Sequence, residues 1–343
     1  EYEIIDEAQV IKNAKTQGAK AVKEISANVR FALTGTPVEN RLSELWSIFD
    51  FLMPGFLYSY RKFRERYELP IVKNQDPEAL TALRRMTGPF VLRRLKKDVL
   101  RELPTKEERI VYSAASGRQQ KLYTASALKL KEALAGGAWS GNGKLEVLSQ
   151  LMRLRQICCD PALCFEDYTG ESAKLETCVS LIASASAAGH KILLFSQFAS
   201  MLERIQERLL QEGISSHLLV GATPKEERSR MVQAFASDEV PVFLISLKAG
   251  GTGLNLTAAD IVIHYDPWWN VAAQNQATDR AYRIGQEKPV TVYKLILKDT
   301  IEENLLKLQN AKLALAAQVV SEGMVSLGDL SQNELMELFE QNP

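Results

Sequence analysis

The chain has 343 residues, 46% of them hydrophobic and 24% charged, a composition typical of a globular protein and unlike that of a disordered one. Its 42 basic and 42 acidic residues cancel to a net charge of +0, so the total charge alone does not indicate a nucleic-acid binder. This length favours two lobes with smaller helical insertions. We recognise no signal peptide and no apolar run of membrane-spanning length, and expect no membrane partner.

The first apolar segment, Tyr2–Ile5, is predicted to be a β-strand that ends in carboxylates. Asp6 and Glu7 follow it directly. Carboxylates at the end of a strand suit a magnesium–nucleotide site, where one holds the ion through water and the next polarises the attacking water. An acidic turn is the common alternative for these residues alone. Because the chain opens within a strand and without Met, we expect it to be the C-terminal part of a longer protein.

A second strand is predicted over residues 29–33, and it runs into Thr34-Gly35-Thr36-Pro37. Ligands gather at the carboxyl ends of strands in open α/β sheets, so two polar strand ends in succession indicate a site. Residues 41–53 carry apolar side chains at helical spacing, and 56–86 suggest an appended helical module. The basic segment 84–97 is either a solvated face or a nucleic-acid or regulatory surface.

Residues 138–145, AWSGNGKL, imitate a phosphate-binding loop without meeting its pattern. The pattern G-x-x-x-x-G-K-[ST] needs a glycine where Ala138 stands and a hydroxyl where Leu145 stands. A predicted helix, 117–134, precedes the segment instead of a strand. We therefore interpret the segment as a flexible connection to the next helix, which begins at Lys144.

Strands and helices alternate regularly in the second half of the chain, which predicts a parallel sheet with helices on both faces. The predicted strands are 191–196, 216–220, 242–246, 260–265 and 290–297, and the predicted helices are 198–212, 225–236, 271–282 and 301–320; residues 108–113 are β-like but precede this alternation. The four cysteines lack paired C-x-x-C spacing, and the three histidines are scattered. We therefore favour reduced, mostly buried thiols over a zinc site, which fits an intracellular compartment.

Polar residues follow these strands too. Thr223 is predicted to cap a helix that carries Arg228, which makes either a backbone-phosphate cradle or an ordinary helix cap. The glycine-rich loop after Lys248 exposes backbone N–H groups that suit phosphate oxygens. Arg280 and Arg283 are predicted to share one face of the helix 271–282, so both can point at one anion.

The order of these motifs resembles the motor domain of the Swi/Snf-type helicase-like ATPases of superfamily two. The motifs that carry the resemblance are DEAQ, LTGTP, FSQF, GATPKEER, GTGLNL and QATDRAYRIGQ, joined by VLRRLKKDVLRELPTK, LRQICCDPALC and DPWWN. They cover nearly the whole chain. The resemblance implies an α/β fold of RecA-like lobes, each a parallel sheet with helices on both faces, with inserted helical protrusions.

The resemblance also implies a division of the chain. Its parts are the remnant of a first lobe (1–55), a helical protrusion and basic linker (56–107), a second helical protrusion (108–170), the second lobe (171–320) and a helical tail (321–343). Duplex DNA would lie across both lobes, with ATP and Mg²⁺ between them. The family's phosphate loop has no counterpart in this sequence, so we expect the chain alone not to hydrolyse ATP.

Individual roles follow from the resemblance. Asp6 would hold magnesium, Glu7 would activate water, and Arg280 and Arg283 would be arginine fingers. The residues implied in DNA contact are Ser196, Gln197, Thr223, Arg228, Lys248, Thr252, Trp268 and Trp269; those near the nucleotide are Gly253 and Gln276; those that couple the two are Thr34, Gly35 and Thr36. For one of the two tryptophans, capping the core is an equally good interpretation.

The leading hypothesis is therefore an ATP-driven translocase on double-stranded DNA that remodels protein–DNA complexes, acting as a monomer. A strand-separating helicase and a catalytically silent DNA-binding scaffold are the alternatives. Displacement of a triplex-forming strand would separate translocation from unwinding, and a missing phosphate-loop lysine would favour the scaffold. We expect a cytoplasmic, nucleoid-associated protein in a bacterium, or a nuclear one in a eukaryote.

Overall fold

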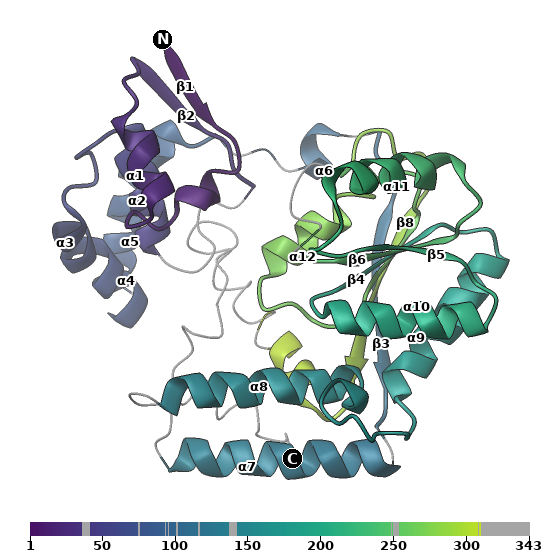
Figure 1. The fold of residues 1–343 in the computed structure, drawn as a ribbon. Coiled ribbons are helices and arrows are strands. Elements are labelled where there is room, and N and C mark those ends of the chain that lie inside the picture. The colour runs from purple at the N-terminus through teal and green to yellow at the C-terminus, as the bar shows by residue number, and fades with distance from the viewer. Residues whose placement is uncertain are drawn as a thin grey trace. The chain divides into compact units, whose positions relative to one another are not determined.

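The computed structural model describes residues 1–35, 42–74, 76–92, 94, 96–100, 102–115, 117–136, 143–247, 249, 254–307 and 309. The chain divides into two compact units, Glu1–Val99 and Leu100–Leu308 (Figure 1). Each unit is described by itself. Among the described residues, no helix is long and apolar enough to cross a membrane.

Unit 1 begins with a small parallel sheet of two strands, β1 (Tyr2–Ile5) and β2 (Val29–Ala32). A short 3₁₀ turn, η1 (Ala8–Ile11), and the helix α1 (Gln17–Glu24) connect them. The buried hydroxyl of Ser47 donates to the carbonyl of Ile11 at 2.7 Å, which fixes the next helix against this turn. The sequence prediction of two strands with polar ends is confirmed.

The rest of unit 1 is helical and shares the core of that next helix, α2 (Leu42–Leu52). Phe63, Tyr67 and Leu83 are buried against its apolar stripe, as its helical spacing predicts. The remaining elements are α3 (Tyr60–Phe63), the π-helix η2 (Arg64–Glu68), α4 (Leu69–Asn74), α5 (Pro77–Thr87), η3 (Gly88–Phe90) and α6 (Lys96–Val99).

Unit 2 is built on a six-stranded sheet in which every pair is parallel, with the order β3-β8-β7-β4-β6-β5. Its strands are β3 (Lys106–Ser113), β4 (Ile192–Ser196), β5 (Ser216–Leu219), β6 (Val242–Ser246), β7 (Ile261–His264) and β8 (Val290–Leu297). Strands β4, β6 and β7 are buried at every position. Because all six strands are parallel, their carboxyl ends lie at one edge of the sheet.

Helices cover both faces of this sheet (Figure 1). One hydrophobic core joins α9 (Ala173–Ala187) and α10 (Ala199–Gln211) to one face. A second core holds α11 (Lys225–Ser237) and α12 (Val271–Thr278) against the other. The expected α/β fold of the RecA-like type is therefore confirmed.

Strand β3 corrects one expectation. The sequence analysis grouped 108–113 with the second protrusion, but the structure pairs β3 with β8 over eight residues as an edge strand of the main sheet. The residues of β3 are charged and largely exposed, so the sequence lacks the apolar run of a buried strand; an edge strand tolerates this because it has a neighbour on one side only.

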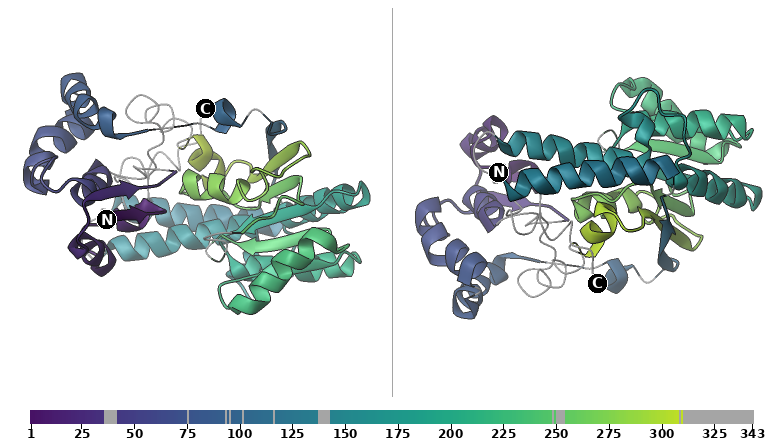
Figure 2. Two further views of the ribbon diagram at one scale, coloured as in Figure 1. Left: turned by 90° about the horizontal axis from the view of Figure 1, so that it is seen from above. Right: turned by 90° about the horizontal axis from the view of Figure 1, so that it is seen from below.

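Two long helices follow β3 and lie side by side, α7 (Gly117–Ala135) and α8 (Gly143–Cys159) (Figure 2). The buried amide of Gln119 donates to the carbonyl of Ile157 at 3.0 Å and ties them together. A short 3₁₀ turn, η4 (Pro161–Leu163), ends this part. Gly143, Lys144 and Leu145 form the first turn of α8, so the end of the AWSGNGKL segment is helical; residues 137–142 lie outside the described residues.

Candidate functional site

The carboxyl ends of β4 and β7 carry a connected polar cluster in unit 2. The hydroxyl of Ser196 donates to Asp266 Oδ1 at 2.5 Å, and the backbone N–H of Gln197 donates to the same oxygen at 3.3 Å. Ser196 is 0% exposed, and its hydroxyl holds Asp266 in place. Its predicted DNA contact stays a prediction.

A buried arginine from α8 completes this cluster. Arg155 is 1% exposed, and its Nη1 donates to Gln197 Oε1 at 2.9 Å while its Nη2 donates to the carbonyl of Pro267 at 2.6 Å. Its Nη2 also lies 3.5 Å from Asp266 Oδ2. Burial lowers the pKa of the Arg155 guanidinium from its ordinary value, and the charge of Asp266 opposes that shift.

The adjacent tryptophans differ in their surroundings. The Arg155 guanidinium lies 5.3 Å from the centre of the Trp269 ring, a distance typical of a cation–π contact. The backbone N–H of Trp268 donates to Gln274 Oε1 at 3.3 Å, which fixes the start of the loop to α12. Both tryptophans are half-buried. Trp269 thus packs on Arg155, and the choice between a DNA contact and core capping stays open for the pair.

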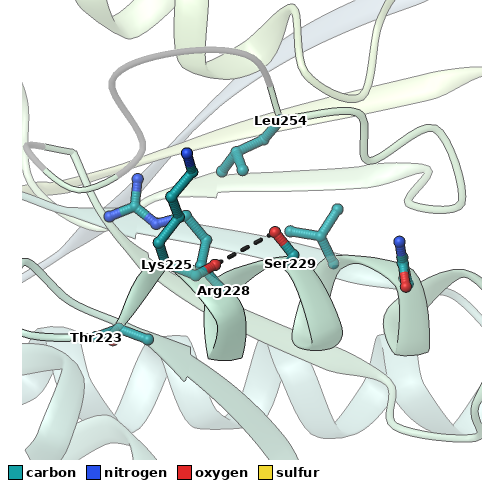
Figure 3. A pocket seen from close by; sticks show the side chains of 7 residues that line it. Thr223, Lys225, Arg228, Ser229 and Leu254 are labelled. Carbon is teal, nitrogen blue, oxygen red and sulfur yellow. Dashed lines mark hydrogen bonds between the residues drawn. The ribbon is translucent and has the colours of Figure 1, made fainter.

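A pocket of about 570 Å³ lies at the start of α11 (Figure 3). Lys225 and Arg228 bring positive charge to it, and Leu254 lines it from the segment after the glycine-rich loop. Arg228 Nε is buried and has no hydrogen-bond partner among the described residues. Glu226 and Glu227 lie in the same first turn, so the helix start carries charges of both signs.

Thr223 does not cap α11, contrary to the sequence prediction. Its hydroxyl accepts a hydrogen bond from the backbone N–H of Val220 at 3.1 Å, and its own N–H donates to the carbonyl of Val220. The residue before the helix is Pro224, which makes no side-chain cap. The threonine closes the turn after β5 instead, and it still lines the pocket.

Arg280 and Arg283 lie beyond α12 in a turn, so the prediction that both share one face of a helix was wrong. The helix ends at Thr278, and the N–H groups of Arg280 and Ala281 donate three residues back, to the carbonyls of Ala277 and Thr278, instead of four. The carbonyl of Arg280 accepts from the N–H of Leu256 at 3.1 Å, and the carbonyl of Ala281 accepts from Gln286 Nε2 at 3.1 Å. As a result Arg280 is buried, whereas Arg283 is exposed.

In unit 1 the two carboxylates and the second strand end are linked by hydrogen bonds. The hydroxyl of Thr34 donates to Gln9 Oε1 at 2.7 Å, and Gln9 Nε2 donates to Glu7 Oε2 at 2.6 Å. Asp6 is exposed and accepts only the N–H of Glu7 in this part of the chain. Two adjacent carboxylates fit a hard cation such as Mg²⁺, provided that water and phosphate oxygens fill its other positions.

The structure describes two of the remaining predicted site residues, Gln276 and Gly35. Gln276 is half-buried on α12, and Gly35 follows Thr34. Thr36, Lys248, Thr252 and Gly253 lie outside the described residues, so their roles stay predictions.

Sequence reasoning missed the roles of Arg155 and Asp266. Arg155 stands within the apolar stripe of α8, between Leu151, Leu154 and Cys158, where the spacing calls for another apolar residue. A charged residue at an apolar position of a helix could have predicted a buried ion pair or hydrogen-bond network, because a buried charge needs a partner.

The structure combines a parallel sheet whose strands end in polar residues, a turn that carries Arg280 and Arg283, and a second pair of strands followed by carboxylates. These features are typical of RecA-like, helicase-related ATPases. The family models agree: an SNF2-related domain matches residues 1–163, and a helicase conserved C-terminal domain matches residues 173–285. The solved SWI2/SNF2 ATPase core of Sulfolobus solfataricus, in complex with dsDNA, is 36% identical, with a TM-score of 0.59 over 100% of this chain and 73% of that one. The chain belongs to the SWI2/SNF2 ATPase family.

Curated relatives extend the comparison. YwqA of Bacillus subtilis, named as an ATP-dependent helicase or translocase, is 43% identical over 98% of this chain and 37% of its own length. The human SWI/SNF-related matrix-associated actin-dependent regulator of chromatin subfamily A member 1 is 35% identical over 98% of this chain and 34% of its own. The chain thus spans about a third of the length of these relatives. ATP use and ATP hydrolysis are properties of this family.

Proposed function

We propose that this chain is part of an ATP-driven translocase on double-stranded DNA and supplies its backbone grip and its arginine fingers. One observation carries the proposal. The carboxyl ends of β4, β5 and β7 lie on one side of the unit 2 sheet, where Gln197 follows β4, Thr223 follows β5 and the Asp266–Trp269 loop follows β7. Contacts of this kind to the DNA backbone carry little sequence information.

The same proposal assigns residues of the chain to the binding and hydrolysis of ATP. Mg²⁺–ATP, when bound, supplies the phosphoryl group to be transferred; Asp6 would hold the ion, and Glu7 would orient the water through the carboxylate that Gln9 fixes. Arg283 would stabilise the charge that develops during phosphoryl transfer, and the buried Arg280 would support it from the same turn. The solved Sulfolobus ATPase core supports DNA as the partner, since it is in complex with dsDNA.

DNA binding by the chain tests the proposal. We expect its affinity for duplexes of different sequence to be similar and to fall steeply between 50 and 200 mM salt, because phosphate contacts release roughly 0.9 counterions each. Arg228→Ala should reduce the slope of log Kd against log salt by about 1. Fluorescence anisotropy with labelled duplexes measures both quantities.

Arg208→Ala is the matched control, since it removes the same charge from α10, on the opposite face of the sheet from α11. Its salt slope should equal that of the unaltered chain. A flat salt dependence, or equal effects of the two variants, would contradict the proposed grip.

A further inference from the structure

Hydrogen bonding is incomplete in the cluster around Arg155. Arg155 Nε, Gln197 Nε2 and Trp269 Nε1 are buried N–H donors that have no acceptor in the part of the chain that the structure describes. Each buried donor without an acceptor costs about 1–3 kcal/mol. Asp266 Oδ2, 3.5 Å from Arg155 Nη2, is a buried acceptor that also has no hydrogen-bond partner among the described residues. Unpaired donors therefore outnumber the unpaired acceptor three to one, which favours the entry of an oxygen acceptor.

Arg155 also decides which way the Gln197 amide points. A guanidinium group can only donate, so the atom that faces Arg155 Nη1 at 2.9 Å must be the amide oxygen. The NH₂ group consequently lies at the other end of the amide, as a donor. The same guanidinium holds the Pro267 carbonyl at 2.6 Å and lies on the face of Trp269. One side chain thus fixes the segments that follow β4 and β7.

We infer that Arg155 is a positioning residue for the DNA grip: it orients the Gln197 amide so that its NH₂ group donates to a backbone phosphate oxygen, and it sets the Asp266–Trp269 loop beside that amide. The inference rests on the proposed function. It also gives the helix pair α7–α8 a direct link to the DNA-contacting edge, because Arg155 belongs to α8.

The chemistry at this position requires arginine. Lysine would keep the positive charge near Asp266, but a single ammonium on a flexible stem cannot hold the amide oxygen and the Pro267 carbonyl in the fixed geometry of a planar fork. Because Gln197 is neutral, its contact with a phosphate releases no counterion, so it adds affinity without changing the salt slope. This separates its contribution from that of Arg228.

A double-mutant cycle on the chain tests the inference, with Arg155→Lys, Gln197→Ala and the double variant measured for duplex DNA affinity. We expect each single variant to bind about tenfold more weakly, a loss of roughly 1.4 kcal/mol, with an unchanged salt slope. The double variant should bind no more weakly than Gln197→Ala, because Arg155 acts through that amide.

Arg153→Lys, an exposed position on the same helix, is the control and should leave affinity unchanged. The inference would be overturned if Arg155→Lys lowered DNA affinity by the same factor in the Gln197→Ala background as in the unaltered chain. Arg155 would then serve packing alone, and water would complete the hydrogen bonds of its cluster. If Arg155→Lys does not fold, Asp266→Asn weakens the same anchor and must show the same dependence on Gln197. An unaltered chain without measurable DNA affinity would contradict the proposed function instead.

Discussion

His264 is a buried side chain whose protonation state affects the stability of the unit 2 core. Its ring stacks on Phe195 at 5.7 Å between centroids, and its Nε2 lies 2.9 Å from the hydroxyl of Thr278 at the end of α12. Burial lowers the pKa of His264 to about 3, and the charge of Lys294 adds to that shift. The imidazole is therefore neutral in the folded state at physiological pH.

This pKa predicts a pH-dependent stability. The unfolded chain binds a proton on His264 near pH 6.5, whereas the folded chain does so only near pH 3. The unfolding free energy should therefore fall as the pH drops from about 6.5 toward 3, by up to about 4–5 kcal/mol from this residue. Urea unfolding at pH 7 and pH 4.5 measures the difference, and His264→Gln should reduce it.

Phe243→Leu, a change in the same core on β6, serves as the comparison because it introduces no titrating group. It should lower stability equally at both pH values. An unchanged pH dependence in His264→Gln would mean that other groups cause it.

Arg155 shows where prediction from sequence ends at the scale of residues. Its position in the apolar stripe of α8 marks it as unusual, but its partners Gln197 and Pro267 stand 42 and 112 residues further along the chain. Ser196 shows the converse: a hydroxyl at a strand end predicts a ligand contact, and only the fold reveals that Asp266 takes that hydrogen bond.

At the scale of elements, the turn after α12 sets Arg280 and Arg283 apart. Gln286 holds this turn by donating to the carbonyls of Thr257, Ala259 and Ala281, and Gly285 adopts a φ of 98°, which favours glycine. These bonds fix the backbone of the turn that carries the exposed Arg283, which the proposed role in charge stabilisation would require.

On the proposed arginine-finger role, Arg283→Ala in a motor assembled from this chain and a lobe with a phosphate loop should lower ATP turnover by a factor on the order of 10³–10⁵ while DNA affinity stays nearly constant. Steady-state hydrolysis with saturating duplex DNA, together with anisotropy, provides both measurements. Arg109→Ala, an exposed arginine on β3, should affect neither. A parallel loss of DNA binding would make Arg283 a phosphate contact.

The elements also differ in how well the sequence predicts them. Strand β6 has the predicted bounds because its apolar and β-branched residues are buried at every position between two helical layers, and β8 has them although Thr291, Tyr293 and Lys294 are only partly buried. Helix α12 was predicted four residues too long, at 271–282, because Ala281 and Tyr282 continue its apolar spacing. Beyond Thr278 the N–H groups of Arg280 and Ala281 donate three residues back instead of four, and hydrogen bonds from Leu256 and Gln286 hold the turn that follows; the apolar spacing registers neither.

At the scale of the whole molecule, the proposed nucleotide residues Asp6, Glu7 and Arg283 stand in a sequence whose 343 residues include no phosphate loop of the glycine-lysine-serine/threonine type. Without the backbone cradle and lysine of that loop, the phosphates of ATP lack their main binding groups. We predict that the chain alone, with or without duplex DNA, releases no phosphate above background in a coupled assay. DNA-stimulated hydrolysis by the chain would contradict this.

The hydroxyl of Tyr282 donates to the carbonyl of Pro104 at 3.0 Å, two residues before β3 begins. The chain coming from unit 1 enters unit 2 through this point, and Tyr282 lies between Ala281 and Arg283 in the arginine turn. A pull on the connecting chain would thus act on the bond to that turn before it reached the eight-residue ladder of β3 and β8. Tension in that segment would therefore change the geometry of the arginine turn as well as strain the sheet.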